Sequence, residues 1–322
     1  MASFVNAMCA ALLMTALAIV PAVRAEPLRT RDLIDLWPGG VGPGSEQSPA
    51  KRTITERSKA AYFPDRSLIG VTRPNLTAFV PDHPNGTSVI VAPGGGYLAI
   101  ALDRGSYEMA RWLNPYGVTV FLLEYRLPGE GHANRQDIPL EDAQRAVRVV
   151  RRHAKEWGLD PNKVGFLGGS AGGNLAASVG TLFDKVAYQP TDDADRLSAR
   201  PDFQILLYPV ISMENGLTHV PTRTNLLGPS PSPEMIEACS LERHVTKSVP
   251  PTFIVVAEDD PVVLPENSIR YYTALKDAGV PAELHVFKEG GHGFGIRDAR
   301  QLPVSNWPHL AVSWLRAGGF IQ

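Results

Sequence analysis

The sequence predicts an α/β fold in which helices cover both faces of a mostly parallel central sheet. Three observations support this: short apolar runs recur along the chain, segments of helical periodicity separate them, and Gly and Pro mark the turns. Strands that are buried on both faces are near-continuously apolar, and they alternate with helices when the sheet is parallel. The expected strands are residues 76–80, 87–92, 118–123, 163–167, 203–208, 252–256 and 282–287.

The expected helices fill the intervals between these strands. They lie at residues 106–113, 171–183, 265–278 and 307–317, with a further helix around 143–154. In this further helix, apolar residues recur at helical spacing, namely Ala143, Ala146, Val147, Val150 and Ala154. This stripe predicts one buried face. It leaves four charged residues to be expected on the surface: Asp142, Arg145, Arg148 and Arg152.

Composition and charge are those of an ordinary globular domain. The 322 residues are 44% hydrophobic and 20% charged, and single α/β domains reach this size. The formal net charge is −2 and no basic block occurs, so we expect no binding to nucleic acid or to an anionic membrane surface. Residues 212–248 form a long insertion rich in Pro, Thr and Asn, which we expect to fold over the sheet edge as a small cap or pocket wall.

Residues 1–25 are predicted to be a secretory signal peptide that is cleaved before Glu26. No charged side chain precedes Arg24, residues 10–20 are apolar, and Val23-Arg24-Ala25 places small residues where a signal peptidase reads them. An uncleaved membrane anchor is the alternative, which Pro21 and the short apolar run disfavour because a span needs about 20 apolar residues. We therefore expect a single mature domain, residues 26–322, that is periplasmic or secreted.

Residues 168–172, Gly-Gly-Ser-Ala-Gly, fit the pattern G-x-S-x-G. This pattern is typical of a sharp turn that presents a serine nucleophile between a strand and a helix, where flanking side chains would clash. An expected strand precedes the motif and an expected helix follows it. Because a serine hydroxyl is a weak nucleophile at neutral pH, Ser170 also needs a general base and an oxyanion site.

His292 is the predicted base. It follows the last expected strand and stands among glycines, in Gly290-Gly291-His292-Gly293, so that its ring can reach over the carboxyl edge of the sheet. It also comes last in the chain order that such a turn predicts for the catalytic residues.

The acid that fixes the imidazole should follow the preceding strand, where Glu258, Asp259 and Asp260 stand in a row. We favour Asp260, because Pro261 and hydrophobic residues after it turn the chain into the next helix. Asp259 stays as the main alternative, since a one-residue shift of the turn would exchange the two roles. The unused carboxylates are expected to be solvated loop charges.

An oxyanion site needs backbone N–H groups aimed at the developing charge. Ala171, which follows the nucleophile and begins a helix, is expected to supply one donor. Gly95 or Gly96, in the glycine loop after the expected strand 87–92, is expected to supply the other. The sequence has no H-E-x-x-H and no paired Cys ligands, so we expect no metal site, and it has no dinucleotide-binding or Walker motif.

Together these motifs resemble those of the α/β-hydrolase superfamily over about residues 75–322. The chain is similar to the bacterial esterase and lipase-like group that includes acetylxylan esterases and relatives of hormone-sensitive lipase. The motifs that carry the resemblance are Pro93-Gly94-Gly95-Gly96-Tyr97, Pro139-Leu140-Glu141-Asp142-Ala143, Gly168-Gly169-Ser170-Ala171-Gly172, Asp260-Pro261-Val262-Val263 with Glu266-Asn267-Ser268, and Gly290-Gly291-His292-Gly293-Phe294. Many relatives carry His where this chain has Pro93.

The resemblance implies an α/β-hydrolase fold, a Ser170–His292–Asp260 triad and no cofactor. With the export signal, it favours a secreted serine carboxylesterase that removes short acyl groups, above all acetyl, from carbohydrate such as acetylated xylan. A peptidase, a lipase or a non-catalytic binding protein on this scaffold are the alternatives. We expect a small-molecule or polysaccharide ester as the partner and no membrane span after cleavage. From position alone, Tyr97, Arg223 and Asn225 are expected to face the substrate pocket.

Overall fold

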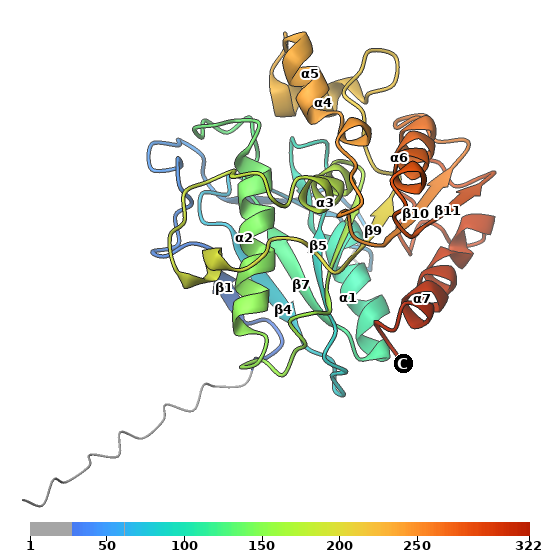
Figure 1. The fold of residues 1–322 in the computed structure, drawn as a ribbon, viewed down its shortest axis with the longest axis horizontal. Helices are drawn as coiled ribbons and strands as arrows, with labels where there is room; N and C mark the ends of the chain where they lie inside the picture. The colour runs from blue at the N-terminus through green and yellow to red at the C-terminus, as the bar shows by residue number, and fades with distance from the viewer. Residues whose placement is uncertain (1–27, 61) are drawn as a thin grey trace, which may run out of the picture.

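A computed structural model describes residues 28–60 and 62–322, so the predicted signal peptide lies outside the described residues. Its centre is an eight-stranded sheet in the order β1-β4-β7-β5-β8-β9-β10-β11 (Figure 1). β4 pairs antiparallel with β1 and β7, and all neighbours from β7 to β11 pair in parallel. The strands are β1 (Leu33–Asp35), β4 (Asn75–Phe79), β5 (Ser88–Ala92), β7 (Thr119–Glu124), β8 (Val164–Gly169), β9 (Phe203–Leu207), β10 (Thr252–Ala257) and β11 (Ala282–Phe287).

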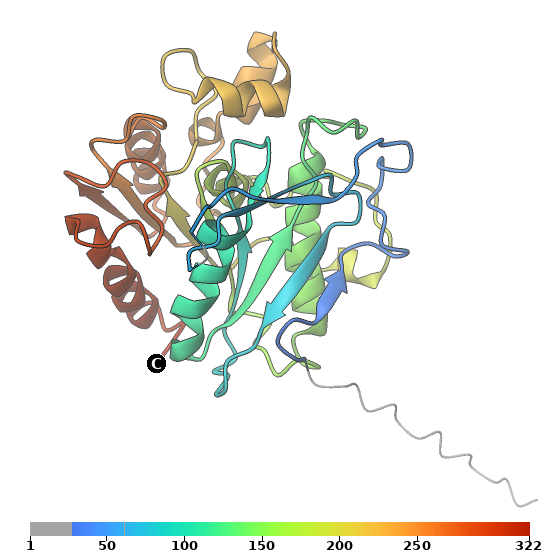
Figure 2. The same ribbon diagram turned by 180° about the vertical axis from the view of Figure 1, so that it is seen from behind.

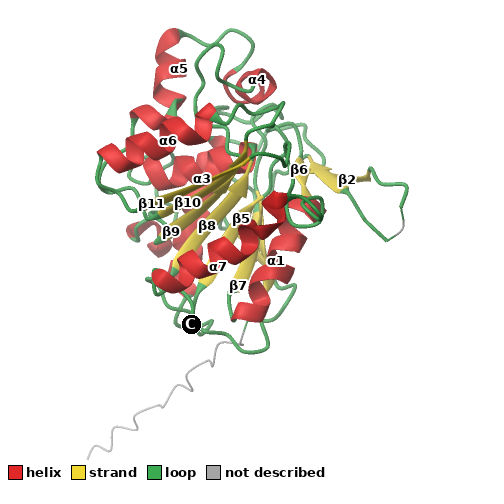
Figure 3. Cartoon of the chain, turned by 90° about the vertical axis from the view of Figure 1, so that its right-hand side faces the viewer, coloured by secondary structure: helices red, strands yellow, loops and turns green. Residues whose placement is uncertain are grey.

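Helices cover both faces of this sheet, as predicted (Figures 1 and 3). The helices on one face are α2 (Ile138–His153), α3 (Ala171–Thr181) and α6 (Glu266–Asp277), and those on the other are α1 (Glu108–Leu113) and α7 (Trp307–Ala317). In Figure 2, which shows the molecule from behind, α1 crosses in front of the strands. The sheet is therefore the middle layer of three.

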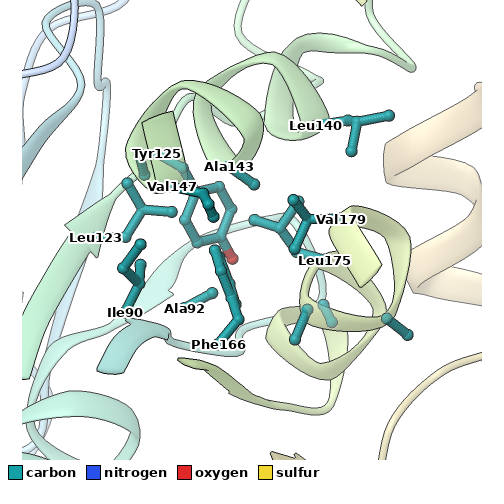
Figure 4. Packing of buried hydrophobic residues seen from close by; sticks show 14 of the residues in the cluster. Ile90, Ala92, Leu123, Tyr125, Leu140, Ala143, Val147, Phe166, Leu175 and Val179 are labelled. Atoms are coloured by element: carbon teal, nitrogen blue, oxygen red, sulfur yellow. The ribbon is translucent and has the colours of Figure 1, made fainter. Parts of the chain in front are cut away.

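Alternate residues of each central strand pack in two separate hydrophobic cores, because successive side chains of a strand point to opposite faces of the sheet. In β5, Ile90 and Ala92 pack with α2 and α3, and Figure 4 shows this cluster around Phe166. Val89 and Val91 pack in the other cluster, with residues of α1 and α7. This double burial explains why the parallel strands read as continuous apolar runs.

Two parts of the chain carry structure that the sequence did not predict in detail. Residues 28–70 contain β2 (Thr53–Glu56) and β3 (Arg66–Ile69), which form a small antiparallel sheet with β6 (Ile100–Ala101). The insertion carries α4 (Val220–Leu227), α5 (Pro233–Cys239) and a 3-10 turn at Leu241–Arg243. α4 and α5 lie above the body in both Figure 1 and Figure 2, at the end to which β5 and β8 point.

The expectation that Asp142 and Arg145 lie on the surface is wrong. Asp142 is fully buried and Arg145 is 3% exposed. Both are ion-paired, Asp142 with Arg126 and Arg145 with Asp192 and Asp195, and a buried charge is tolerated where it is paired and hydrogen-bonded. The helical spacing therefore identified the apolar face of α2 correctly but could not reveal partners from distant segments.

Arg126 is the centre of the larger network. Its side chain is fully buried, and it donates from Nη2 to Asp142 Oδ1 at 2.7 Å and to Glu141 Oε2 at 3.0 Å. Asp142 Oδ1 also accepts from Trp37 Nε1 at 2.8 Å, so the carboxylate joins α2 to the N-terminal segment. Burial is the main cause that raises the pKa of Glu141 to about 7, against the opposing effect of Arg126.

Replacing Asp142 with Ala should lower the free energy of unfolding by about 3–5 kcal/mol, because the change leaves the buried Arg126 guanidinium without its main counter-charge. Equilibrium unfolding in urea measures this. Asp193→Ala is the matched control, since Asp193 is highly exposed, and its effect should stay within about 0.5 kcal/mol. Equal effects of the two variants would contradict the role given to the Arg126 network.

Candidate active site

The residues that the sequence singled out meet at one edge of the sheet. Ser170 follows β8, Asp260 follows β10, His292 follows β11, and the glycine loop at Gly94 follows β5. These four strands are parallel, so their carboxyl ends lie on the same side. Open α/β sheets bind their ligands at this edge.

Ser170 occupies a strained turn. Its φ of 57° and ψ of −124° are a combination that a residue with a side chain rarely adopts, at a cost of about 1–3 kcal/mol. The surroundings hold it there: the Ser170 N–H donates to Leu207 O at 3.0 Å, and its carbonyl accepts from Asn174 N and Val210 N. A Cβ on Gly172 would stand 2.1 Å from Ala92 O, so a glycine is required where α3 passes the end of β5.

The three predicted side chains form a connected chain of hydrogen bonds. His292 Nε2 lies 2.9 Å from Ser170 Oγ, and His292 Nδ1 lies 2.8 Å from Asp260 Oδ2. An ionised carboxylate can only accept, so Nδ1 carries the proton and Nε2 offers its lone pair to the serine hydroxyl. This is the tautomer that a general base needs.

Asp260 is held more firmly than an ordinary loop residue. Its side chain is fully buried, and Oδ1 accepts from the N–H groups of Val262 and Val263, each at 2.9 Å. One oxygen is thus fixed by the backbone while the other faces His292. The two backbone hydrogen bonds fix the orientation of the Asp260 carboxylate, and the carboxylate in turn fixes the orientation of the His292 ring.

Asp259, the alternative acid, binds the backbone of the loop that carries His292 and does not bind the His292 ring. Its Oδ1 accepts from Gly290 N at 2.9 Å and from Gly291 N at 2.8 Å, the two residues before His292. It is exposed, as expected of an unused carboxylate, but it is not a free solvated charge. Two consecutive acids therefore act on one loop, Asp259 on its backbone and Asp260 on the ring of His292.

The glycine loop lies against the turn at Ser170. A Cβ on Gly94 would stand 2.7 Å from Gly169 O, so a side chain there would force the two apart. Among the described residues, no hydrogen-bond partner is recorded for the N–H groups of Gly95, Gly96 and Ala171. Ala171 begins α3, where the first N–H groups have no partner within the helix. The absence of partners within the described chain is consistent with the predicted oxyanion donors, whose role stays a prediction.

Comparison with known proteins identifies the family of this chain. A family described as having the alpha/beta hydrolase fold matches residues 89–296. The chain belongs to the α/β-hydrolase fold family. An acetylxylan esterase of Xylanibacter ruminicola is 36% identical over 225 residues, which are 69% of this chain and 44% of that protein. An endo-1,4-beta-xylanase B of Butyrivibrio fibrisolvens is 35% identical over 224 residues, 69% of this chain and 35% of that protein.

This α/β-hydrolase chain thus spans less than half the length of those two relatives. One solved structure, in contrast, is matched over nearly its whole length. The crystal structure of an acetyl ester-xyloside bifunctional hydrolase from Caldicellulosiruptor lactoaceticus has a TM-score of 0.74 at 36% identity, covering 90% of this chain and 97% of that one. The predicted fold and the resemblance to the acetylxylan esterase group are therefore confirmed.

The three side chains expected to face the pocket of this hydrolase have other partners. Tyr97 is buried, and its hydroxyl donates to Asn174 Oδ1 at 2.8 Å. Arg223 donates to Met213 O within the insertion. Asn225 Nδ2 donates to Gly96 O at 2.8 Å, so α4 binds the glycine loop directly. Tyr97 and Asn225 lie in or next to the glycine loop, as their positions in the sequence suggested. Their polar side-chain atoms make hydrogen bonds that hold this loop in place.

The loop is also held where relatives often carry His. Pro93 cannot donate a backbone N–H, but its carbonyl accepts from the buried Tyr125 hydroxyl at 2.7 Å. Tyr125 directly follows β7, the neighbour of β5 in the sheet. The hydrogen bond ties the start of the glycine loop to the sheet.

Sequence reasoning missed Tyr208 as a part of the site. It follows β9 and has a φ of 37°, and its ring lies edge-on to His292 with the centroids 5.0 Å apart. It also packs edge-on against Phe294. Its place after a parallel strand, as for Ser170 and Asp260, is the signal that could have found it.

The described part of the chain offers neither a cluster of metal ligands nor a membrane-spanning helix. No group of three or more His, Cys, Asp or Glu side chains there could hold a metal ion. No helix among these residues is long and apolar enough to cross a membrane.

Removing the Asp259 carboxylate should slow ester hydrolysis without unfolding the protein. Asp259→Ala frees the two glycine N–H groups before His292, and a small displacement of a catalytic group can cost roughly 10–100-fold in rate. We expect kcat to fall by about that factor, with a small change in Tm. Steady-state kinetics with p-nitrophenyl acetate and thermal unfolding measure the two effects.

Asp259→Asn keeps an acceptor oxygen and should recover most of the lost kcat. Glu258→Gln is the control, because Glu258 is an exposed neighbour that contributes no recorded side-chain bond within the described chain. Full activity of Asp259→Ala would show that the histidine loop keeps its position without this carboxylate.

Proposed function

We propose that the chain is a secreted serine carboxylesterase that hydrolyses short-chain esters, above all acetyl esters of carbohydrate such as acetylated xylan. The observation that carries the proposal is the pair of hydrogen bonds of His292, whose Nε2 accepts from the Ser170 hydroxyl and whose Nδ1 donates to Asp260. A nucleophile, its base and an acid that orients the base are the parts that acyl transfer requires.

In the proposed reaction, His292 Nε2 takes the proton of Ser170 as Oγ bonds to the ester carbonyl carbon. The carbonyl oxygen becomes an anion that accepts from the N–H groups of Ala171 and of Gly95 or Gly96. His292 then returns the proton to the alcohol oxygen as its bond to the carbonyl carbon breaks. Water repeats the sequence on the acyl-enzyme, and the acid is released with Ser170 restored.

The substrate class rests on the relatives. The similar proteins include an acetylxylan esterase, a xylanase and an acetyl ester-xyloside hydrolase, which favours an acetylated sugar as the natural ester. The predicted signal peptide agrees with a polymer that meets the enzyme outside the cytoplasm.

N-terminal sequencing of the exported protein should give Glu26 as the first residue, and an intact Met1 would contradict export with cleavage.

Ser170→Ala should lower kcat with p-nitrophenyl acetate by about 10⁴-fold or more, because the nucleophile of a triad cannot be replaced by the remaining groups. Asp260→Asn should cost about 10⁴-fold through the wrong imidazole tautomer. An organophosphonate should label Ser170 in the unaltered protein, as seen by mass spectrometry of its peptides. Ser313→Ala on α7 is the matched control and should keep full activity. Persistent activity in Ser170→Ala would end the proposal.

A series of p-nitrophenyl esters tests the acyl specificity. We expect kcat/KM to fall from acetate to butyrate to octanoate, and acetate to be released from acetylated xylan. A preference for octanoate would favour a lipase, cleavage of peptides a peptidase, and no release above background a binding protein.

A further inference from the structure

The start of the insertion crosses the catalytic edge between two fixed points. On the acid side, Asn267 in the first turn of α6 donates from Nδ2 to Leu217 O at 2.9 Å. Its Oδ1 accepts from the N–H groups of Ile211 and Ser212, each at 3.0 Å. On the other side, Asn225 binds Gly96 O in the glycine loop. Residues 217–225 therefore bridge the segment after Asp260 and the predicted oxyanion donors.

His219 lies between these two fixed points, directly before α4. Its Nδ1 is 2.8 Å from Thr222 Oγ1, which fixes the direction of the ring. Thr222 is fully buried, and its Oγ1 is 3.8 Å from the place that a Cβ on Gly96 would occupy. The half-buried ring of His219 is thus oriented by a buried hydroxyl, and that hydroxyl lies next to the glycine loop.

Burial, and after it the charge of His292, lower the pKa of His219 below its usual value, while the charge of Asp260 acts the other way. At neutral pH His219 is therefore an uncharged ring, and it can both donate and accept a hydrogen bond.

The second ring nitrogen of His219 is left for a ligand. Among the described residues, Nε2 has no hydrogen-bond partner, and it is not one of the buried polar atoms without a partner. Solvent or a bound molecule therefore reaches it. The triad and the oxyanion donors act on the ester group and offer nothing that recognises the alcohol, which has to lie near His292 to receive its proton.

We propose that His219 Nε2 binds a hydroxyl of the leaving alcohol on the carbon next to the ester, as in a sugar or another vicinal diol. The inference rests on the proposed function and adds a residue that selects the alcohol. A site built to bond a hydroxyl discriminates against the analogue that lacks it, because its polar group is then left unpaired.

Two esters that differ by one hydroxyl test the proposal: the monoacetate of trans-1,2-cyclohexanediol and cyclohexyl acetate. The measured quantity is the ratio of their kcat/KM values. The unaltered protein should prefer the diol monoacetate. His219→Ala should reduce this ratio about ten-fold, the factor expected for the loss of one hydrogen bond. Thr222→Val, which frees the ring, should reduce it in the same direction.

His219→Gln retains a polar end and should recover part of the ratio, and His285→Asn on β11 is the control, since His285 pairs with Glu283. Thermal unfolding checks that each variant is folded. An unchanged ratio in His219→Ala overturns the proposal, whether both rates fall together or neither falls. The proposed function is judged separately, by whether Ser170→Ala abolishes cleavage of p-nitrophenyl acetate. If that cleavage does not depend on Ser170, both ideas fail.

Discussion

The close contact between the loop after β5 and the turn after β8 is the constraint on which the rest of the site depends. At Gly94 a Cβ would approach Gly169 O to 2.7 Å, and at Gly172 a Cβ would approach Ala92 O to 2.1 Å. Side chains at these positions would push apart the two strand ends. The hydroxyl of Ser170 and the backbone donors of the loop would then no longer share one small space. The glycines are thus needed for the distance between two elements as well as for turns.

Hydrogen bonds from buried side chains preserve this arrangement. Tyr125 holds the carbonyl of Pro93, Tyr97 bonds to Asn174 on α3, and Asn174 Nδ2 donates to Val210 O. Each bond joins the chain after one strand to a neighbouring element. The strain at Ser170 can persist because these surroundings leave the turn no other conformation.

The sequence predicted the parts of the molecule that follow from periodicity and chain order. The strands and helices were located because both faces of the sheet are buried, and β5 and α7 lie within a residue of their expected bounds. Ser170, His292 and Asp260 could be proposed because the carboxyl ends of parallel strands meet. Asp260 was favoured over Asp259, but the sequence left Asp259 as an alternative, since the choice depends on which way each side chain turns.

Contacts between distant segments lay beyond the reach of sequence reasoning. Asp142 looked like a surface charge because its partners, Arg126 and Trp37, are remote in the chain. Asn225 and His219 lie in an insertion without apolar periodicity, so nothing in the local pattern indicates that α4 returns to the glycine loop. Such pairs become visible only once the elements are placed in space.

The bond from Asn225 to Gly96 has a consequence for how this enzyme could diversify. In many proteins an insertion can be exchanged freely, because the scaffold below it keeps the reactive groups in place. Here the segment best placed to choose the alcohol also steadies the backbone that would stabilise the transition state. If this segment binds the alcohol as proposed, mutations that adapt α4 to a new alcohol would alter turnover as well, and selectivity and rate would have to evolve together.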